Sequence, residues 1–360
     1  MSLIGDVEAY EAWLGQHCHV VERGLEEKHR RMAGDAFMFF RATCFRFARK
    51  FNGWFPDLEP ALKIPSVGDA HVENFGTWRD AEGRLVWGVN DFDEAAILPW
   101  THDLIRLATS ARLAPGLGGA QTARAEAILQ GYQGGLENPA PLFVDDTRPW
   151  LLALCEPPGA TGRFERDLSR LEDDAPPLPV AALLRRHLPP DAVVEAVGSW
   201  QKGGGSLGRP RYVMVARWHG GTAVREAKAL VPSAWAWAEG KIPAAGKTGD
   251  SALFMELTAG PYRSADPHLV VEDGFVVRRI AADSLKIELK GKAVQACTTD
   301  LLRAMGAELA ALHAAGGAPG LILRELRRRE TGWLHAAART AEGEVVEDFA
   351  RWQAWYEDHS

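Results

Sequence analysis

The sequence has few cysteines and no long apolar run. Only 4 of its 360 residues are cysteine, and none of them forms a Cys-x-x-Cys pair. This argues against a disulfide framework or a cysteine zinc site and is typical of reduced cytoplasmic thiols. No apolar run approaches the roughly 20 residues that span a bilayer. The first residues also lack the basic and apolar stretches of a signal peptide, so we expect neither feature and a cytoplasmic location.

An excess of basic charge is also lacking. Lysine and arginine number 41 against 48 aspartates and glutamates, which gives a formal net charge of −7. General binders of nucleic acid or anionic membranes need a basic surface, so we expect neither partner. The hydrophobic fraction of 46% is typical of a globular protein. The length suits one large domain or two parts that share a cleft.

The hydrophobic periodicity changes twice along the chain. Apolar residues recur at helical spacing near both ends, whereas alternation and β-branched residues are concentrated between residues 193 and 289. We therefore predict an α+β protein in which a β block of about a hundred residues is inserted between two mostly helical blocks. Helices are expected at 6–50, 101–135, 179–188, 251–258, 293–315 and 345–356. Strands are expected at 75–78, 84–89, 193–197, 212–216, 223–230 and twice within 268–289, and loops at 54–66 and 239–250.

Two polar loops flank the first predicted hairpin. One reads Gly68-Asp-Ala-His-Val-Glu-Asn74, and the other reads Val89-Asn-Asp-Phe-Asp-Glu94. Oxygens of Asp and Asn are suitable ligands for a hard cation such as Mg²⁺. The three acids of the second loop either face water or surround a cation, because unpaired buried carboxylates are costly. Ordinary turns exposed to solvent are the alternative for both loops.

A glycine-rich segment and a lysine lie in the β block. Residues 203–208 match G-x-G-x-x-G, but a β-rich run follows instead of the helix of a dinucleotide-binding fold. This order suits a hairpin that covers nucleotide phosphates, with a plain hairpin as the alternative. Lys228 follows on the next strand, where it is either an ordinary exposed lysine or a phosphate ligand. Together with the two polar loops, these features supply the parts that phosphoryl transfer needs, namely positioning and charge neutralisation.

These motifs resemble those of the protein-kinase-like superfamily, in particular its aminoglycoside-phosphotransferase branch. That branch carries His-Gly-Asp-x-His-x-x-Asn, a hairpin, Ile-Asp-Phe/Trp-Glu/Asp and then a helix with Asp-Leu. Residues 67–74 match except that Val67 replaces the first histidine, and residues 89–93 and 102–104 match the later motifs. The chain is also similar to the bacterial family called domain of unknown function 2252. Its Gly-Asp-x-His-x-x-Asn-Phe-Gly, Asn-Asp-Phe-Asp-Glu, Pro-Trp-x-x-Asp-x-x-Arg-Leu and Gly-x-Gly-Ser-x-Gly signatures recur here.

The resemblance implies a bilobal protein-kinase-like fold, but the order of the motifs differs. Kinases place the glycine loop and its lysine before the catalytic loop, whereas here the catalytic loop comes first. A circular permutation reconciles the two orders, and it is tolerable where the chain ends lie close together. Residues 1–190 would then form the mostly helical large lobe and 191–290 the antiparallel small lobe. Residues 291–360 would return to the large lobe.

The resemblance also implies roles for individual residues. Asp69 would orient the acceptor hydroxyl and take its proton, His71 would support the loop, and Asp103 would brace it from below. Asn74 and Asp91 would hold Mg²⁺, while Asp93 would bind a second metal or only cap a turn.

The expected nucleotide-binding residues lie in the β block. Gly203, Gly205, Ser206 and Gly208 would cover the ATP phosphates, and Lys228 would contact the α- or β-phosphate. The anionic partner of Lys228 is expected to be Glu256, with Glu226 and Glu272 as alternatives.

The leading prediction is therefore an ATP- and Mg²⁺-dependent phosphotransferase that acts on a small molecule or, less favoured, on a protein. A nucleotide-binding pseudokinase is the first alternative, because Val67 replaces the histidine. AMP transfer is a second alternative. A metal-dependent phosphohydrolase is a third, although the upstream Asp-x-His and downstream Gly-Asn-His of metallophosphoesterases are missing from the sequence.

Overall fold

The chain forms a mixed α+β structure that is about half helical, with antiparallel sheets. The computed structural model describes residues 2–58, 61–144, 148–155, 162–200, 204–241 and 250–359. The helices are α1 (Leu3–Leu14), α2 (Glu22–Met32), α3 (Ala36–Ala42), α4 (Cys44–Trp54), η1 (Pro56–Leu58), α5 (Thr101–Leu113), α6 (Gln121–Glu137), α7 (Pro149–Cys155), α8 (Arg163–Leu168), α9 (Leu178–His187), α10 (Ala234–Ala238), α11 (Ser251–Thr258), α12 (Lys292–Ala296), α13 (Thr298–Ala315), α14 (Pro319–Leu326) and α15 (Trp333–His359). The strands are β1 (Lys63–Ser66), β2 (Phe75–Arg79), β3 (Leu85–Val89), β4 (Ala96–Pro99), β5 (Leu142–Phe143), β6 (Val193–Ser199), β7 (Arg211–Trp218), β8 (Gly221–Ala229), β9 (Val270–Glu272) and β10 (Phe275–Ile280).

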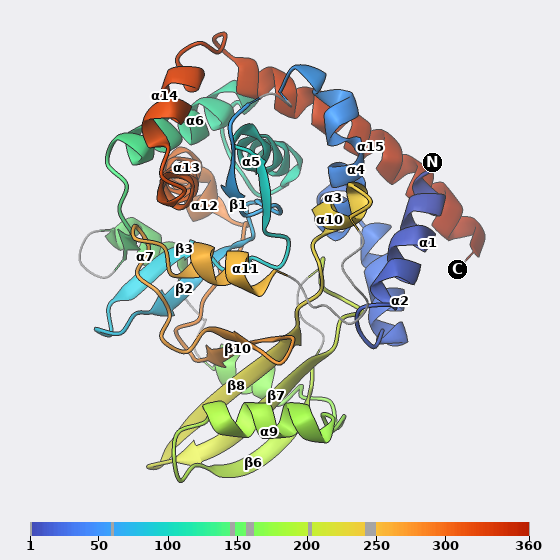
Figure 1. Ribbon diagram of the computed structural model, residues 1–360, viewed down its shortest axis with the longest axis vertical. Coiled ribbons are helices and arrows are strands. Elements are labelled where there is room, and N and C mark those ends of the chain that lie inside the picture. Colours follow the sequence, from blue (N-terminus) through green and yellow to red (C-terminus); the bar gives the residue numbers. More distant parts are fainter. Residues whose placement is uncertain are drawn as a thin grey trace.

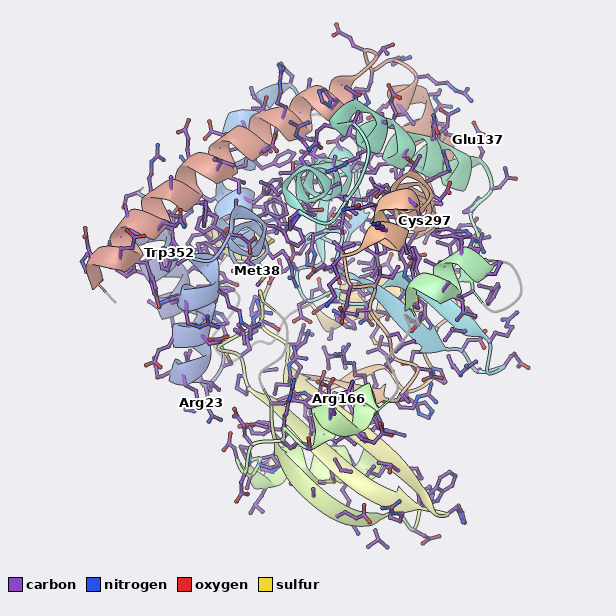
Figure 2. The ribbon with its side chains drawn as sticks, turned by 180° about the vertical axis from the view of Figure 1, so that it is seen from behind. Arg23, Met38, Glu137, Arg166, Cys297 and Trp352 are labelled. Atoms are coloured by element: carbon purple, nitrogen blue, oxygen red, sulfur yellow. The ribbon has the colours of Figure 1, made fainter. Side chains whose placement is uncertain are left out.

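Helices from both ends of the sequence pack into one helical part (Figure 1). Helix α15 crosses α1, α2, α3 and α5, so the first and last helices lie side by side. Figure 2 shows Trp352 of α15 near α2, where its indole donates a hydrogen bond of 3.3 Å to the carbonyl of His29. None of the described helices combines the length and apolar character needed to cross a membrane.

Glycines allow α6 and α13 to approach closely. A Cβ added to Gly306 would lie 2.1 Å from the carbonyl oxygen of Ile128, and one added to Gly131 would lie 1.9 Å from that of Arg303. Real side chains do not tolerate such distances to backbone atoms. The helix that ends at Ala315 is therefore fixed against the core of the helical part.

Two small sheets place the polar loops next to each other. Strands β2, β3 and β5 form one antiparallel sheet, and β1 pairs with β4 in another. In the β2–β3 hairpin Phe75 pairs with Val89, so both loops leave the hairpin at its same end. The backbone N–H of Asn90 donates to the carbonyl of Asn74 over 2.9 Å, which joins the loops directly.

The larger sheet has the strand order β6-β7-β8-β10-β9 and is antiparallel throughout. Successive side chains of β7 point to opposite faces of this sheet, and both faces are packed. Met214 packs toward α9, whereas Val213 and Val215 pack toward α8 and its neighbours. The β7–β8 turn has positive φ at His219 and Gly220, as primed hairpin turns require. Further along β8, the face that carries Val224 continues with Glu226 and Lys228.

Several predicted elements are divided differently. The expected helix at 6–50 is four helices, and that at 101–135 is two, because Pro115 cannot continue α5 and Gly116 packs against the carbonyl of Leu289. The expected helix at 293–315 breaks at Cys297, and the tail helix is longer than expected. Strand β10 ends at Ile280, so residues 281–290 are not a strand. Most of the predicted loop at 239–250 lies outside the described residues.

Candidate functional site

The loop after β1 is held by hydrogen bonds from its backbone to helix α5. The carboxylate of Asp103 accepts from the N–H of Val67 over 2.7 Å and from that of Gly68 over 2.9 Å. Asp103 is 1% exposed, and its Oδ2 also lies 3.1 Å from Nε2 of His313 on α13. The expected brace below the loop thus lies in direct contact with the loop backbone.

Gly68 fits a position that no other residue tolerates. Its φ is +77°, and a Cβ there would lie 1.9 Å from the carbonyl oxygen of Glu94. Its own carbonyl accepts from the indole of Trp235 over 3.0 Å. The next residue, Asp69, is thereby presented from a fixed backbone.

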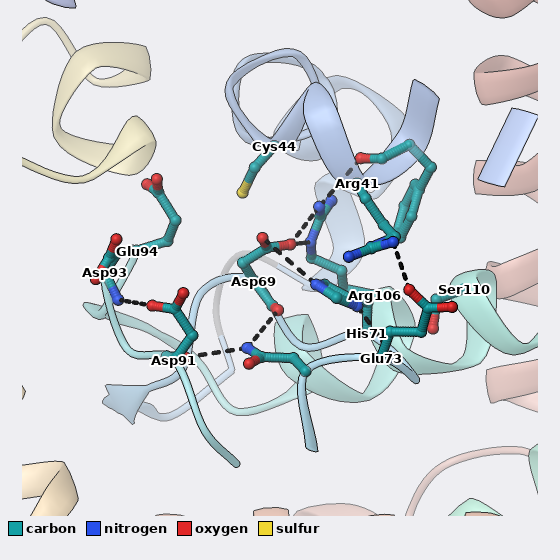
Figure 3. A network of polar contacts seen from close by, with 12 residues as sticks. Arg41, Cys44, Asp69, His71, Glu73, Asp91, Asp93, Glu94, Arg106 and Ser110 are labelled. Carbon is teal, nitrogen blue, oxygen red and sulfur yellow. Dashed lines mark hydrogen bonds and ion pairs between the residues drawn. The ribbon is translucent and has the colours of Figure 1, made fainter. Parts of the chain in front are cut away.

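One oxygen of Asp69 is bound and the other faces the cavity. The guanidinium of Arg106 donates to Oδ1 from Nε over 2.6 Å and from Nη2 over 2.5 Å (Figure 3). The side chain remains 18% exposed. Burial raises the pKa of Asp69, and Arg106 only partly opposes this rise. Asp69 is therefore a carboxylate with increased basicity and one free oxygen, as a general base requires.

His71 lies beside Asp69 as a neutral imidazole. Its Nδ1 accepts from the N–H of Glu73 over 3.2 Å, so Nε2 carries the proton and lies 4.0 Å from Oδ2 of Asp69. Burial lowers the pKa of His71 well below its usual value, and the cations Arg41, Arg106 and Lys286 lower it further. Across the loop, Arg41 of α3 forms an ion pair of 2.5 Å with Glu73.

The amide of Asn74 connects the two polar loops. Its Nδ2 donates to the carbonyls of Asp69 over 3.2 Å and Asp91 over 3.0 Å, whereas its Oδ1 is buried without a partner among the described residues. Oδ1 of Asp93 is likewise buried without a partner. Orphaned oxygens next to the carboxylate of Asp91 suit a hard cation, so Asn74, Asp91 and Asp93 fit Mg²⁺ by donor type. Within the described ranges no three His, Cys, Asp or Glu side chains are grouped as a metal site by themselves.

The ammonium of Lys228 lies between the two carboxylates of the second loop. Nζ is 2.8 Å from Oδ2 of Asp91 and 2.7 Å from Oδ2 of Asp93. Burial alone would raise the pKa of Asp91, but Lys228 outweighs it and lowers that pKa well below its usual value. Burial and the neighbouring Asp91 raise the pKa of Asp93 to about 6. Oδ2 of Asp93 also accepts a hydrogen bond of 3.2 Å from the guanidinium of Arg209.

The expected pairing of Lys228 with Glu256 is not what the structure has. In the part of the chain that the structure describes, the carboxylates paired with Lys228 are Asp91 and Asp93, and Glu256 is exposed on α11. The alternatives are not its partners either. Glu272 pairs with Arg186 and His187, and Glu226 pairs with arginines.

Glu226 is the centre of a second buried cluster. It is 1% exposed and accepts hydrogen bonds from the indole of Trp200 over 2.6 Å, from Arg278 over 2.8 Å and from Arg211 over 3.1 Å. Burial alone would raise the pKa of Glu226, but the two arginines lower it far below its usual value. Arg211 also donates to Oγ of Ser206 over 2.9 Å, which ties the cluster to the glycine-rich segment.

The glycine-rich segment reaches the loop of Asp69. Gly203 lies outside the described residues. A Cβ on Gly205 would lie 3.0 Å from the carbonyl oxygen of Arg41 and 4.0 Å from Oδ2 of Asp69. Gly208 has a φ of +89°, and its carbonyl accepts from the N–H of Val21 over 2.9 Å. The segment is thus anchored at its end and open above the free oxygen of Asp69.

The two polar loops, the cluster around Glu226 and the described part of the glycine-rich segment border one cavity of about 650 Å³ between the helical part and the larger sheet. Its size is within the range of small-molecule sites. The predicted site residues that line it are Asp69, His71, Asn74, Asp91, Asp93, Gly205 and Ser206, and Lys228 reaches it through its ion pairs. Asp103 acts on it only through the loop backbone, and Glu256 takes no part.

Sequence reasoning did not assign the arginines and one lysine of this cavity. Arg41, Arg106, Arg209, Arg211 and Arg278 each bind a carboxylate of the site, and Lys286 lines the cavity. For Arg106 a signal exists, since the Asp-x-x-Arg spacing places it one helical turn after Asp103. The others come from distant segments with no local pattern.

Among comparisons with known proteins, one family model matches part of the chain. Residues 20–137 match the model of a family described as "Uncharacterized protein conserved in bacteria (DUF2252)". The match spans about a third of the chain and includes both polar loops and Asp103. It bears out the resemblance to this family over those residues. No curated protein and no solved structure was found to match the chain.

Proposed function

We propose that this chain is an ATP- and Mg²⁺-dependent phosphotransferase with a circularly permuted, bilobal protein-kinase-like fold, and that its acceptor is a small molecule. The observation that carries the proposal is that residues of the expected types come together in space. Asp69, Asn74, Asp91, Gly205 and Lys228, which lie far apart in the sequence, meet at one cavity. They are the residue types that position a nucleotide, neutralise its phosphates and accept a hydroxyl proton.

The packing of the two chain ends supports the permutation. His313, near the end of α13, lies in hydrogen-bond contact with Asp103, which holds the loop of Asp69. In the kinase order this helix would lead directly into that loop. Here α13 and β1, which leads into the loop of Asp69, are far apart in the sequence, yet the two elements pack together. The low cysteine content and the acidic balance agree with a cytoplasmic enzyme without a nucleic-acid partner.

In the proposed reaction the free oxygen of Asp69 accepts the proton of the acceptor hydroxyl. The acceptor oxygen forms a bond to the γ-phosphorus, and the bond from that phosphorus to the β–γ bridging oxygen breaks, which leaves ADP. Arg106 keeps the Asp69 carboxylate oriented, and Lys228 exchanges a carboxylate partner for a phosphate. Asn74, Asp91 and Asp93 would hold Mg²⁺, which when bound neutralises phosphate charge.

Thermal unfolding with Mg²⁺ and ATP tests nucleotide binding. At 100 times the dissociation constant, binding stabilises the folded chain by about 2.7 kcal/mol, or about 3–4 °C for a chain of this length. No shift at millimolar ATP refutes the phosphotransferase and the pseudokinase alike.

Turnover of Asp69→Asn tests the chemistry. The variant should keep the ATP shift and lose about 10²- to 10⁴-fold in kcat. Asp358→Asn, an exposed change near the end of α15, is the matched control. Equal activity of Asp69→Asn and wild type removes Asp69 from its proposed role, and the product mass distinguishes a transferred phosphoryl group from AMP.

A further inference from the structure

Lys286 is a cation of the cavity to which no role has been assigned. It lies in the irregular segment after β10, lines the cavity and is exposed to it. The charged groups that act on it are Arg278, Asp91, Arg41 and Arg211. Among the described residues it forms no ion pair or hydrogen bond.

The backbone that carries Lys286 is fixed on both sides. The carbonyl of Leu285 accepts from the N–H of Thr77 over 2.9 Å, and the N–H of Leu285 donates to the Thr77 hydroxyl over 2.9 Å. On the other side, Ile287 is only 6% exposed. Strand β2 therefore determines where the side chain of Lys286 enters the cavity.

Carboxylates that line the cavity already have cationic partners. Glu73 pairs with Arg41, and Asp91, whose charge acts on Lys286, shares Lys228 with Asp93. Glu226 is shared by two arginines, which leaves that cluster with an excess positive charge. An anionic ligand is therefore the group that Lys286 can still bind, since an unpaired cation facing a confined cavity gains from a counter-charge.

The position of Lys286 in the cavity indicates which anionic group of a ligand would lie near its amine. Its charge acts on His71, beside the proposed base, and on Asp91, beside Lys228. The amine thus lies near both halves of the site. In a transfer from a nucleotide at Lys228 to a hydroxyl at Asp69, the phosphoryl group crosses the space between them.

Resting on the proposed function, we infer that Lys286 binds the phosphoryl group that is transferred, the γ-phosphate of ATP. Its ammonium offsets negative charge on the non-bridging oxygens, and its proton stays on the amine throughout. The hydroxyl proton goes to Asp69, and the electron pair of the broken P–O bond leaves with ADP. Lys228 is left to the phosphates that remain on the nucleotide.

Binding of a nucleotide with and without the γ-phosphate tests this inference. The affinities of Mg²⁺-ADP and of a Mg²⁺-bound non-hydrolysable ATP analogue are measured for wild type, Lys286→Met, Lys286→Arg and Lys292→Met. Lys292 is exposed at the start of α12 and is not one of the described residues that line the cavity, so it is a matched control. Lys286→Met should weaken the ATP analogue about 10- to 100-fold relative to ADP, because one charge-assisted contact is lost. Lys286→Arg and Lys292→Met should keep the wild-type ratio.

Three outcomes are distinguishable. If Lys286→Met binds both ADP and the ATP analogue as tightly as wild type does, the inference is overturned while the phosphotransferase proposal stays intact. An equal loss of ADP and analogue affinity also overturns it, because Lys286 would then contact the nucleotide elsewhere. Absence of binding of either nucleotide to wild type overturns the proposed function itself.

Discussion

Replacement of Asp103 by asparagine tests how strongly the loop of Asp69 depends on helix α5. Asp103 is 1% exposed and accepts two backbone hydrogen bonds, from Val67 and Gly68. Asparagine keeps one acceptor oxygen and places an NH₂ group opposite one of these N–H donors. A lost hydrogen bond to a charged group costs about 1.5–3 kcal/mol, and an unsatisfied buried donor costs about 1–3 kcal/mol. The variant should therefore lose about 3–5 kcal/mol of unfolding free energy.

Thermal unfolding measures this loss directly. For a chain of this length, 3–5 kcal/mol corresponds to a decrease in Tm of about 4–7 °C. Asp300→Asn is the control, because Asp300 is 60% exposed and pairs with Arg303 on the surface of α13. It should change stability by less than about 0.5 kcal/mol. If Asp103→Asn lowers Tm by no more than the control, the assignment of its hydrogen bonds is wrong.

The same variant also tests the link from this brace to the chemistry. Asp69 follows directly after Gly68, so a loosened loop moves the proposed base. Misplacement by about 1 Å costs about 10²-fold in rate. We expect this loss in kcat, with the affinity for Mg²⁺-ADP unchanged, because no nucleotide ligand is altered. A loss of ADP affinity that equals the loss in kcat would contradict a positioning role.

Three further variants test the packing, the buried cluster and the cavity charge. Gly306→Ala should destabilise the chain by about 1–3 kcal/mol or more, because the added Cβ would lie 2.1 Å from the carbonyl oxygen of Ile128. Gly343→Ala, at an exposed position of α15, should instead stabilise the chain by up to about 1 kcal/mol. The midpoints of denaturant unfolding measure both changes. Glu226→Gln should lower the free energy of unfolding by about 3–5 kcal/mol, whereas the surface change Glu195→Gln should alter it little. The deficit of Glu226→Gln relative to wild type should begin to shrink as pH falls below about 4.5 and should keep shrinking as pH falls towards the lowered pKa of the folded carboxylate. The reduced contact with bulk water inside the cavity, together with Arg278, lowers the pKa of Lys286 to about 8. The preference for the ATP analogue over ADP should therefore fall as pH rises from 7 to 9 in wild type, through loss of the amine's proton, but not in Lys286→Arg. A parallel fall in both proteins would exclude Lys286 as the titrating group.

The first hairpin and strands β6 to β8 of the larger sheet could be predicted from sequence, whereas β1 lies within the expected loop at 54–66 and β4 and β5 were not predicted. Alternation identified β2 and β3 to within a residue at each end, and this hairpin alone places the two polar loops together. The limits of the long helices could not be predicted as well. Periodicity continues across Thr43 and Cys297, although the helices are interrupted there. At both breaks a threonine hydroxyl donates to the carbonyl four residues earlier, from Thr43 to Phe39 and from Thr298 to Val294.

The partner of Lys228 shows why part of the site could not be predicted. Several glutamates were at plausible distances along the chain, and strand alternation places Glu226 on the same face as Lys228. The actual partners are decided by how the larger sheet meets the second polar loop, a contact over 137 residues. Periodicity did carry a warning about Glu256, because Leu253, Phe254 and Leu257 form the buried face of α11 and leave residue 256 outside.

Cations of the β segments and carboxylates of the second loop join the sheet to the helical part. Lys228 binds Asp91 and Asp93, and Arg209 binds Asp93 and Glu94. The proposed reaction draws on these same groups, since phosphates compete for Lys228 and a cation competes for Asp91. Two like-charged carboxylates that lose Lys228 without a replacement repel each other and take up protons. Nucleotide and cation are therefore expected to bind together rather than separately, because each supplies the counter-charge that the other removes.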